Sequence, residues 1–204
     1  DASIYSVIVT GSSNTFSSGV DLSSMLGEGG NEYEEPFETC IDALINFTKP
    51  LIGAVEGAAI GGGATILLHF DAVFISPNTK IKYPFSDLGL APEVGSSFLL
   101  FQSIGYQKAA QLLFESNPID GNSYYELGLA KYVGDDFLAQ AINYANELTK
   151  QSMSSIIETK AILKSFMHKD LSLARDLETK AMKKLFGSED NLQAVKIFFA
   201  QKSK

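Results

Sequence analysis

The sequence predicts an α/β fold that ends in an all-helical region, and three observations indicate this. Short β-branched or apolar runs, of which Leu51 to Val55 is the clearest, are typical of buried strands. Glycine-rich turns follow such runs and lead into apolar helices, which is the order of elements in an α/β fold. From about Asp136 onward no strand pattern appears. We therefore expect an α/β core over residues 1–135 and a helical region over residues 136–204.

The first hundred residues alternate predicted strands and helices. A β-branched run from Ile4 to Val9 predicts a strand that ends in a loop, and Asp21 is a candidate N-cap of a short helix. Apolar residues at helical spacing predict a helix from Pro36 to Phe47 that starts on its proline. After the strand at residues 51–55, a glycine turn leads into an apolar helix from Ala64 to Phe70 and then into a strand from Ala72 to Ile75.

The second hundred residues are predicted to be mainly helical. We expect helices over Phe98 to Ser103 and over Gln107 to Phe114, and Asp120 or Asn122 could cap a third that ends near Gly128. Three or four helices follow from about residue 136 onward. Their candidate capping residues are Ser152, Asp170 and Ser188.

The formal charge of −8 weighs against a nucleic-acid partner, because phosphate binding needs a basic surface. The charge is also unevenly distributed. Residues 1–102 carry three Lys and twelve Asp or Glu, whereas residues 103–204 carry thirteen basic and twelve acidic side chains. A polyanionic ligand would therefore have to bind lysines toward the C-terminus.

Composition also bounds the compartment. No apolar run reaches the roughly 18 residues that a membrane span needs, and the chain does not begin with a charged stretch followed by an apolar segment. We therefore expect a soluble protein that is not secreted. Cys40 is the only cysteine, and together with His69 and His168 it gives no metal-ligand cluster. The sequence thus predicts no disulfide, no structural metal and a reducing compartment.

The glycine-rich turn from Gly57 to Gly63 is the first of three segments that could carry chemistry. Consecutive glycines before a helix let the backbone approach a ligand closely and leave the first amides of the helix free. The turn lacks the Gly-Lys-Ser/Thr of a nucleotide-phosphate loop and the spacing of a dinucleotide-binding turn. Close packing of helix against strand would explain the glycines equally well.

The other two segments are Ser18-Gly19-Val20-Asp21 and the surroundings of Glu93. One amide from each of two converging glycine turns would make an oxyanion hole of the kind that stabilises a thioester enolate, although Ser-Gly-Val-Asp is also a common helix cap. Glu93 lies among apolar residues and glycine. Desolvation there raises the pKa of a carboxyl group and suits a general base, whereas a first-turn Glu that complements a helix dipole is the commoner use of such a residue.

The order and spacing of these segments resemble the crotonase, or enoyl-CoA hydratase/isomerase, superfamily. The matching segments run from Thr10 to Leu22, from Lys49 to Gly63, from Phe70 to Val73 and from Gly121 to Val133. The resemblance covers nearly the whole chain and implies a spiral core of strand–strand–helix units followed by an all-helical C-terminal region. Members of the family normally have further residues before the point where this chain begins, so we expect the first strands of the spiral to be missing.

By this resemblance, the amides of Val20 and Gly62 form the oxyanion hole and Glu93 is the single base of a Δ3,Δ2-enoyl-CoA isomerase. The segment from Tyr83 to Glu93 is similar to that of the peroxisomal-type isomerases. The two glutamates that hydratases of the family use fall here on Thr65 and Phe85, and neither can activate water. The residues implied for substrate and CoA binding are Ser18, Gly19, Asp21, Leu22, Gly61, Phe85, Leu90 and Pro92.

The implied reaction shifts the double bond of 3-enoyl-CoA to give 2-trans-enoyl-CoA in fatty-acid β-oxidation, with no cofactor beyond the coenzyme A of the substrate. Dienoyl-CoA isomerisation, thioester hydrolysis and a non-catalytic acyl-CoA-binding module are the alternatives. The acyl-chain pocket is expected along Met25 to Phe37. We expect a peroxisomal or cytoplasmic protein. The isomerases often end in Ser-Lys-Leu, a peroxisomal signal, and this chain stops at Lys202-Ser203-Lys204, one residue short of it, so its C-terminus does not distinguish the two compartments.

The helices between Ser152 and Gln201 carry more apolar residues than a domain of this size can cover. Helices that simply cap their own α/β domain are the alternative. Crotonase-like proteins typically assemble through this region, so the resemblance implies a homotrimer or hexamer. It also implies that Lys183, Lys184 and Lys196 could reach the phosphates of coenzyme A.

Overall fold

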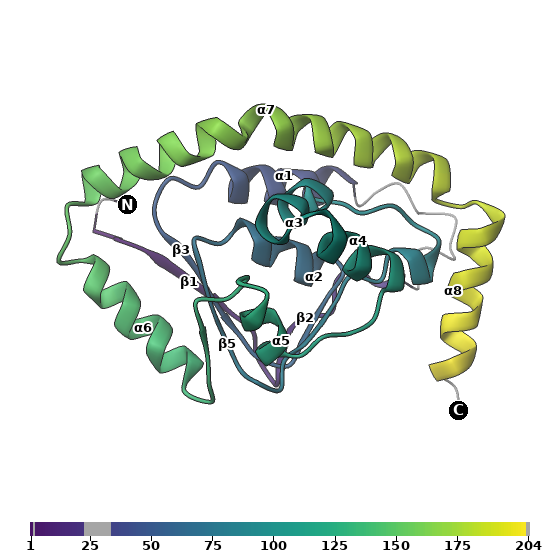
Figure 1. Ribbon diagram of the computed structural model, residues 1–204, viewed down its shortest axis with the longest axis horizontal. Helices are drawn as coiled ribbons and strands as arrows, with labels where there is room; N and C mark the ends of the chain where they lie inside the picture. Colours follow the sequence, from purple (N-terminus) through teal and green to yellow (C-terminus); the bar gives the residue numbers. More distant parts are fainter. Residues whose placement is uncertain (2, 23–33, 203–204) are drawn as a thin grey trace.

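The computed structural model of the chain describes residues 1, 3–22 and 34–202, and its core holds two parallel β-sheets (Figure 1). The four-stranded sheet has the order β1 (Val7–Thr10), β3 (Leu51–Val55), β5 (Ala72–Ile75) and β7 (Tyr132–Val133). The three-stranded sheet has the order β2 (Thr15–Ser17), β4 (Ala58–Ile60) and β6 (Lys80–Lys82).

The chain passes alternately through the two sheets. β1 leads into β2, β3 into β4 and β5 into β6, so each pass adds one parallel strand to both sheets. Every residue of β3 and of β5 is buried, which is why their sequences are continuous apolar runs without polar alternation. This repeated path, and the helical end described below, confirm the predicted α/β fold class.

Helices connect the strands of the core. Their bounds are α1 (Glu34–Ile45), α2 (Gly62–Thr65), the 3-10 turn η2 (Ile66–His69), the 3-10 turn η3 (Ser86–Leu88), α3 (Ser96–Ile104), α4 (Tyr106–Glu115) and α5 (Gly121–Glu126). The helix predicted from Ala64 to Phe70 is thus a short α-helix that tightens into a 3-10 turn. α1 begins two residues before Pro36, which still lies in the first turn, where a missing N–H costs no hydrogen bond.

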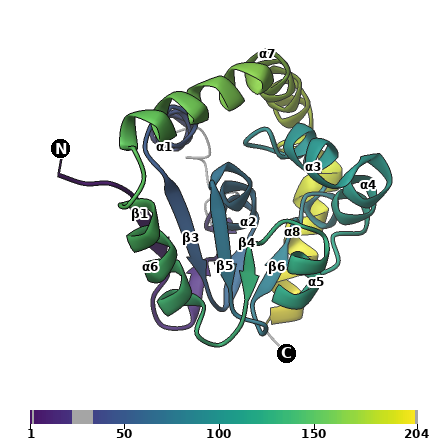
Figure 2. The same ribbon diagram turned by 60° about the vertical axis from the view of Figure 1, so that its left-hand side comes forward.

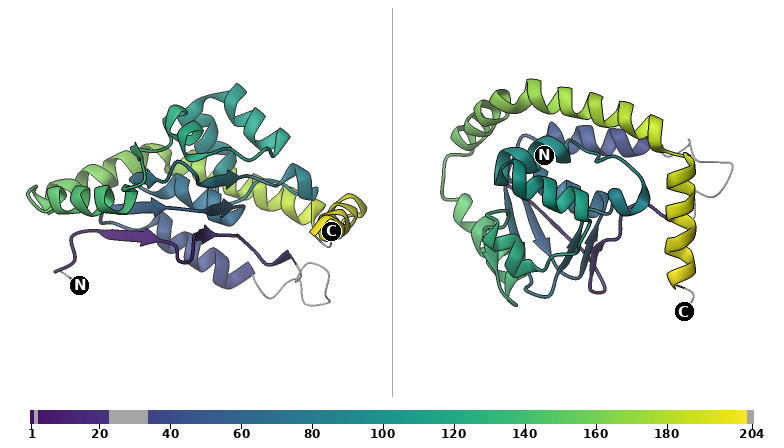
Figure 3. Two further views of the ribbon diagram at one scale, coloured as in Figure 1. Left: turned by 90° about the horizontal axis from the view of Figure 1, so that it is seen from below. Right: turned by 45° about the vertical axis from the view of Figure 1, so that its right-hand side comes forward.

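Three helices follow the core: α6 (Phe137–Leu148), α7 (Met153–Leu185) and α8 (Glu189–Lys202). α6 packs on β3 and β5 and lies beside the four-stranded sheet (Figure 2). α7 arches over α1 and α3, and α8 turns away from its end (Figures 1 and 3). None of the helices in the described ranges is long and apolar enough to cross a membrane.

Predicted capping side chains make hydrogen bonds in the first turns of α5, α7 and α8. The Asp120 side chain accepts a hydrogen bond from Ser123 N (2.8 Å) at the start of α5, and Ser152 accepts one from Ser155 N (3.4 Å) at the start of α7. Ser188 accepts one from Asn191 N (3.3 Å) in the first turn of α8. The cap predicted at Asp170 is wrong, because this residue is exposed in the middle of the 33-residue α7.

Two other predictions differ from the structure or lie outside it. The first strand is Val7–Thr10, and Ile4 and Tyr5, which were predicted to belong to it, are 45% and 43% exposed. The short helix expected after Asp21 and most of the segment from Met25 to Phe37 lie outside the described residues.

Two lysines of α7 fasten the helix to the core. Lys160 Nζ is buried and donates to Lys49 O (2.8 Å) and to Asp71 Oδ2 (2.6 Å), and the same carboxylate oxygen accepts from Leu51 N (2.7 Å) at the start of β3. Lys164 Nζ donates to two carbonyl groups at the end of α1, those of residues 45 (2.6 Å) and 47 (3.1 Å). Burial lowers the pKa of Lys164 to about 8. These bonds join α7 to both the sheet and α1.

Candidate active site

Gly62 lies where the three-stranded sheet gives way to α2. Gly61, the residue before it, has φ of 56°, a left-handed conformation that favours glycine, and its amide donates to Lys82 O (3.0 Å) on β6. Gly62 is the first residue of α2, a position whose N–H has no partner within a helix. The turn therefore presents the Gly62 amide at the end of the sheet.

The Ser18–Val20 segment meets this turn because β2 pairs with β4. Gly19 has φ of +78°, and a Cβ built on it would lie 2.6 Å from Ile60 O and 3.4 Å from Gly62 N. Only glycine allows so close an approach of the two backbones. Val20 comes next in the chain and is 43% exposed. The structure thus brings the two predicted oxyanion-hole residues, Val20 and Gly62, into neighbouring turns.

Glu93 reaches the same place from the loop between η3 and α3. Its Oε1 lies 3.4 Å from the position that a Cβ on Gly62 would occupy, and the ring of Phe37 lies 3.6 Å from that position. Gly62 therefore has the Gly19 backbone on one side and the Glu93 carboxylate on another. Gly62 and Glu93 border one space, whose wall includes Phe37 of α1, and Val20 is the residue after Gly19 in the neighbouring turn.

The electrostatics of Glu93 suit a group that exchanges protons near neutral pH. Desolvation, then the negative charge of Glu178 and then that of Glu38, raise the pKa of Glu93 to about 7. Within the described ranges, the Glu93 carboxylate makes no hydrogen bond or ion pair that would hold it in the charged form. The protonated and ionised forms are therefore close in free energy at pH 7.

The two positions that would hold carboxylates in a hydratase carry buried side chains that cannot activate water. Thr65 is fully buried, and its hydroxyl donates to Gly62 O (3.1 Å). Phe85 is 4% exposed and belongs to the hydrophobic core around Tyr83 and Leu100. The ring of Phe85 therefore lies in the core beneath the site, where it is not available for direct contact with a substrate.

The remaining residues predicted to bind substrate lie around the same turns. Ser18 and Asp21 are exposed, and Gly19, Leu22, Gly61, Leu90 and Pro92 are partly exposed. Leu90 N donates to Phe85 O (2.8 Å), which folds the segment before Glu93 back on itself. No cluster of three or more His, Cys, Asp or Glu that could hold a metal ion occurs in the described part of the chain.

Two side chains that hold the Glu93 loop were not predicted as functional. Glu178 of α7 accepts hydrogen bonds from Gly95 N (2.7 Å) and Ser97 N (2.9 Å), and His69 Nε2 bonds Val94 O (2.8 Å). Glu178 lies 85 residues after Glu93 in a helix with unremarkable local sequence, so only the folded chain shows the contact. The one signal available for His69 was its place six residues after the glycine-rich segment.

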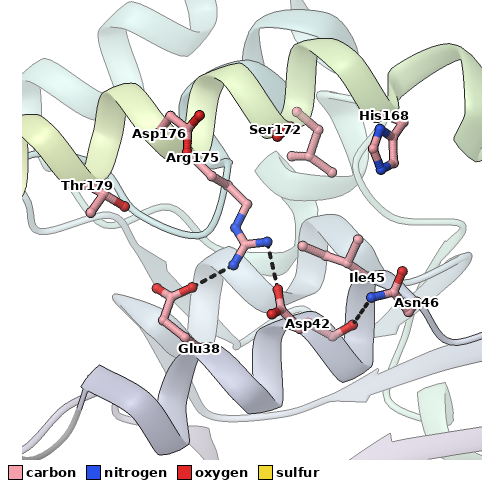
Figure 4. A pocket seen from close by; sticks show the side chains of 10 residues that line it. Glu38, Asp42, Ile45, Asn46, His168, Ser172, Arg175, Asp176 and Thr179 are labelled. Atoms are coloured by element: carbon pink, nitrogen blue, oxygen red, sulfur yellow. Dashed lines mark hydrogen bonds and ion pairs between the residues drawn. The ribbon is translucent and has the colours of Figure 1, made fainter.

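A polar pocket of about 390 Å³ lies between α1 and α7 (Figure 4). Arg175 crosses it and bonds Glu38 Oε2 (2.5 Å) and Asp42 Oδ1 (2.8 Å). The other lining residues are Ile45, Asn46, His168, Leu171, Ser172, Asp176 and Thr179. Neither Gly62 nor Glu93 is among them, and the ionic lining does not suit an acyl chain.

Comparison with known proteins agrees with this geometry. A family model described as "Enoyl-CoA hydratase/isomerase" matches residues 1–204. A Bacillus subtilis protein named "Probable enoyl-CoA hydratase" is 27% identical over 99% of this chain and 81% of its own length. "Enoyl-CoA delta isomerase 2" of Rattus norvegicus is also 27% identical, over 97% of this chain and 52% of its own length.

A solved structure gives the same result for the fold. The enoyl-CoA hydratase/isomerase from Pseudoalteromonas atlantica T6c superposes with a TM-score of 0.91 at 26% identity, covering 98% of this chain and 81% of that one. The fold, the converging glycine turns and the full-length family match agree with one another. The chain is an enzyme of the enoyl-CoA hydratase/isomerase family, in the crotonase superfamily.

Proposed function

We propose that the chain is a Δ3,Δ2-enoyl-CoA isomerase that uses Glu93 as its only acid–base group. Glu93 removes a proton from C2 of a 3-enoyl-CoA, and the electron pair moves through the carbonyl carbon onto the thioester oxygen. The protonated Glu93 then returns the proton to C4, the enolate collapses, and the double bond is left between C2 and C3. The reaction is balanced without water or a cofactor.

The observation that carries this proposal is the position of Glu93 beside Gly62. The amides of Val20 and Gly62 hold the enolate oxygen, and each such donor contributes about 3 kcal/mol to stabilising the transition state in other oxyanion holes. The carboxylate lies next to the same glycine, within reach of carbons adjacent to the bound carbonyl group. One residue that alternates as base and acid needs a pKa near the working pH, which the burial of Glu93 supplies.

Hydration is disfavoured by the same geometry. Addition of water across a double bond needs two carboxylates to hold and activate the water, and here their positions are taken by a buried threonine and a core phenylalanine. The names of relatives at 26–27% identity include both hydratases and isomerases, so they leave the two reactions open. Thr65 and Phe85, at the positions of those two carboxylates, support isomerisation as the proposed reaction.

The test compares two substrates with one pure protein. With a 3-enoyl-CoA, the absorbance of the conjugated 2-enoyl thioester should rise. With a 2-enoyl-CoA, the same absorbance should stay constant, because no water is added. Release of free thiol from either substrate would instead indicate thioester hydrolysis, and rapid formation of a 3-hydroxyacyl product would remove the isomerase proposal.

The substrate's coenzyme A is proposed to reach lysines at the C-terminal end. Lys183 and Lys184 are exposed in the last turn of α7, and Lys196 is exposed on α8. Their positive charges lie on helices that otherwise close one end of the molecule (Figure 3). Phosphate groups of coenzyme A would find here the local basic surface that the acidic first half of the chain lacks.

We further propose that the chain assembles as a homotrimer or a pair of trimers through α7. An apolar stripe runs along this helix, with exposed fractions of 78% for Phe166 and 54–59% for the other members, Ile162, Leu163, Leu173 and Leu177. At 3.6 residues per turn these five side chains share roughly a third of the helix circumference. Lys160, Leu171 and Glu178, which are buried, face the core. Burial between subunits would remove the stripe from water.

A further inference from the structure

The backbone that follows Glu93 has an unusual conformation. Val94 has φ of 63° and Gly95 has φ of 75°, so two successive residues are left-handed. This region is unfavourable for a β-branched residue such as valine, and such strain persists only where the surroundings impose it. Val94 is buried, and α3 begins directly after Gly95. The position of Glu93 therefore depends on whatever holds these residues in place.

Glu178 supplies the main restraint. Its Oε2 accepts from Gly95 N (2.7 Å), and its Oε1 accepts from both Ser97 N (2.9 Å) and Ser97 Oγ (2.5 Å). Gly95 is the N-cap residue of α3 and has no side chain with which to cap the helix. A carboxylate from a different helix thus performs the capping that Ser, Thr, Asp or Asn at the N-cap would normally perform.

α7 also fits closely against the loop. A Cβ on Gly95 would lie 2.3 Å from Leu171 Cδ1, so even a methyl group at this position would require the Leu171 side chain to move. Glu178 itself is 6% exposed. The Glu178 carboxylate is therefore held by packing as well as by three hydrogen bonds. A carboxylate on the surface would not be fixed in this way.

His69 provides a second restraint from the opposite side. Its Nε2 bonds Val94 O (2.8 Å), and since a carbonyl oxygen only accepts, this nitrogen carries the proton. Desolvation lowers the pKa of His69, which keeps the ring neutral at neutral pH. η2, which ends at His69, continues α2, which begins at Gly62. One short helical segment therefore connects the oxyanion-hole amide to the loop of the base.

We propose that Glu178 is a positioning residue for Glu93: by capping α3 from α7, it fixes the left-handed turn at residues 94–95 and so aims the Glu93 carboxylate at the space beside Gly62. This inference rests on the proposed role of Glu93 as the base. Glu178 does not touch the substrate in this scheme. It acts through the backbone of residues 95–97, with His69 as the second anchor.

Glu178 also sets the charge that Glu93 experiences. Among residues 1, 3–22 and 34–202, the charged or titratable groups that face Glu93 are Glu178 from α7, Glu38 from α1 and, across the Val94 carbonyl, His69 from η2. Arg175 bonds Glu38, so part of that negative charge is compensated. Removing the charge of Glu178 should therefore lower the pKa of Glu93, whereas a purely structural residue would leave it unchanged.

The test is Glu178→Gln, with kcat and KM for a 3-enoyl-CoA measured as functions of pH. We expect kcat to fall by about tenfold to a hundredfold, since a misplacement of about 1 Å has that effect on a positioned group. KM should stay within about threefold of the wild-type value, because binding contacts are untouched. The acidic limb of the kcat/KM profile should move to lower pH. Asp170→Asn is the matched control, because it removes one charge from an exposed position of the same helix.

Two further variants separate geometry from charge. Ser97→Ala removes one hydrogen bond to Glu178 and keeps the charge, so kcat should fall while the acidic limb stays in place. Glu178→Asp keeps the charge but shortens the side chain by one methylene group. The acidic limb of its kcat/KM profile should therefore stay at the wild-type pH, and its kcat should fall. These two variants carry the test if Glu178→Gln does not fold. In every soluble variant, amide hydrogen exchange at residues 95–97 should become faster.

The outcomes distinguish this inference from the proposed function. Failure of the wild-type protein to convert a 3-enoyl-CoA, or full activity of Glu93→Gln, would remove the proposed function itself. Suppose that the wild type is active and Glu93→Gln is not. If Glu178→Gln then shows the wild-type kcat and an acidic limb at the wild-type pH, the positioning role of Glu178 is overturned and the proposed function stands. Should that variant not fold, unchanged kcat in both Ser97→Ala and Glu178→Asp would overturn it.

Discussion

Replacing Gly62 by alanine should lower activity about a hundredfold or more without harming the fold. The added Cβ would lie 3.4 Å from Glu93 Oε1 and 3.6 and 3.7 Å from two ring atoms of Phe37, all of which are ordinary van der Waals distances. The backbone at this position is not left-handed, and alanine forms helices more readily than glycine by up to about 1 kcal/mol. The variant should therefore melt at or slightly above the wild-type temperature.

The same methyl group occupies the space that the substrate needs. For proton transfer, C2 of the acyl group must come within about 3–3.5 Å of a Glu93 oxygen while its carbonyl oxygen stays on the amide of residue 62. A methyl group in contact with both forces the substrate away by about 1 Å, which costs about a hundredfold in rate, or about 2.7 kcal/mol. We expect kcat/KM for a 3-enoyl-CoA to fall at least this far.

Gly63→Ala is the contrasting variant. A Cβ there would lie 2.4 Å from Ser17 O and 2.7 Å from Ser17 Cβ, so it should lower the melting temperature by separating α2 from β2. The assays are thermal melting by circular dichroism and the absorbance of the conjugated thioester. Wild-type turnover in folded Gly62→Ala would show that the reacting carbons do not lie between this glycine and Glu93.

Three other predictions follow from the site and the surface. Glu93→Gln should reduce isomerase turnover by about a hundredfold or more and still bind acyl-CoA, and more than about a tenth of wild-type turnover would mean that another group is the base. The raised pKa of Glu93 means that the folded state binds its proton more tightly than the unfolded state, so Glu93 costs stability as pH rises above its unfolded value. Glu93→Gln should therefore raise the free energy of unfolding by up to about 3 kcal/mol at pH 8 and by almost nothing near pH 4, as measured in urea; equal gains at both pH values would contradict the shift. Phe166→Ser should release monomers in sedimentation experiments, with exposed Lys169→Ser as the control on the same helix, and a wild-type protein that is already monomeric at micromolar concentration would refute assembly through α7.

Much of the core could be predicted because its signals are local. β3 and β5 have the bounds predicted for them, since each is a short apolar run between polar or proline residues and is buried on both faces. The capping side chains of Asp120 and Ser152 were predicted for the same reason. The family resemblance then indicated the positions of Val20, Gly62 and Glu93 in the chain, although only the fold shows that their turns meet.

The features that the sequence did not predict depend on contacts between residues that are far apart in the chain. Asp170 has the residue type of a cap, but good helix formers surround it and α7 is anchored to the core on both sides of it, so the helix continues. The role of Glu178 depends on a contact across more than eighty residues, which no local pattern indicates. The wall formed by Phe37 likewise depends on how α1 packs over α2.

The unbroken length of α7 has a mechanical consequence. Lys160 and Glu178 are 18 residues apart, so at 1.5 Å per residue about 27 Å of continuous helix connects the N-terminal ends of β3 and β5 with the loop of the base. The same helix therefore holds the start of β3 through Asp71 and the first turn of α3 through Glu178. A partner bound to the outer, apolar side of α7 would therefore contact the same helix whose inner side positions the Glu93 carboxylate.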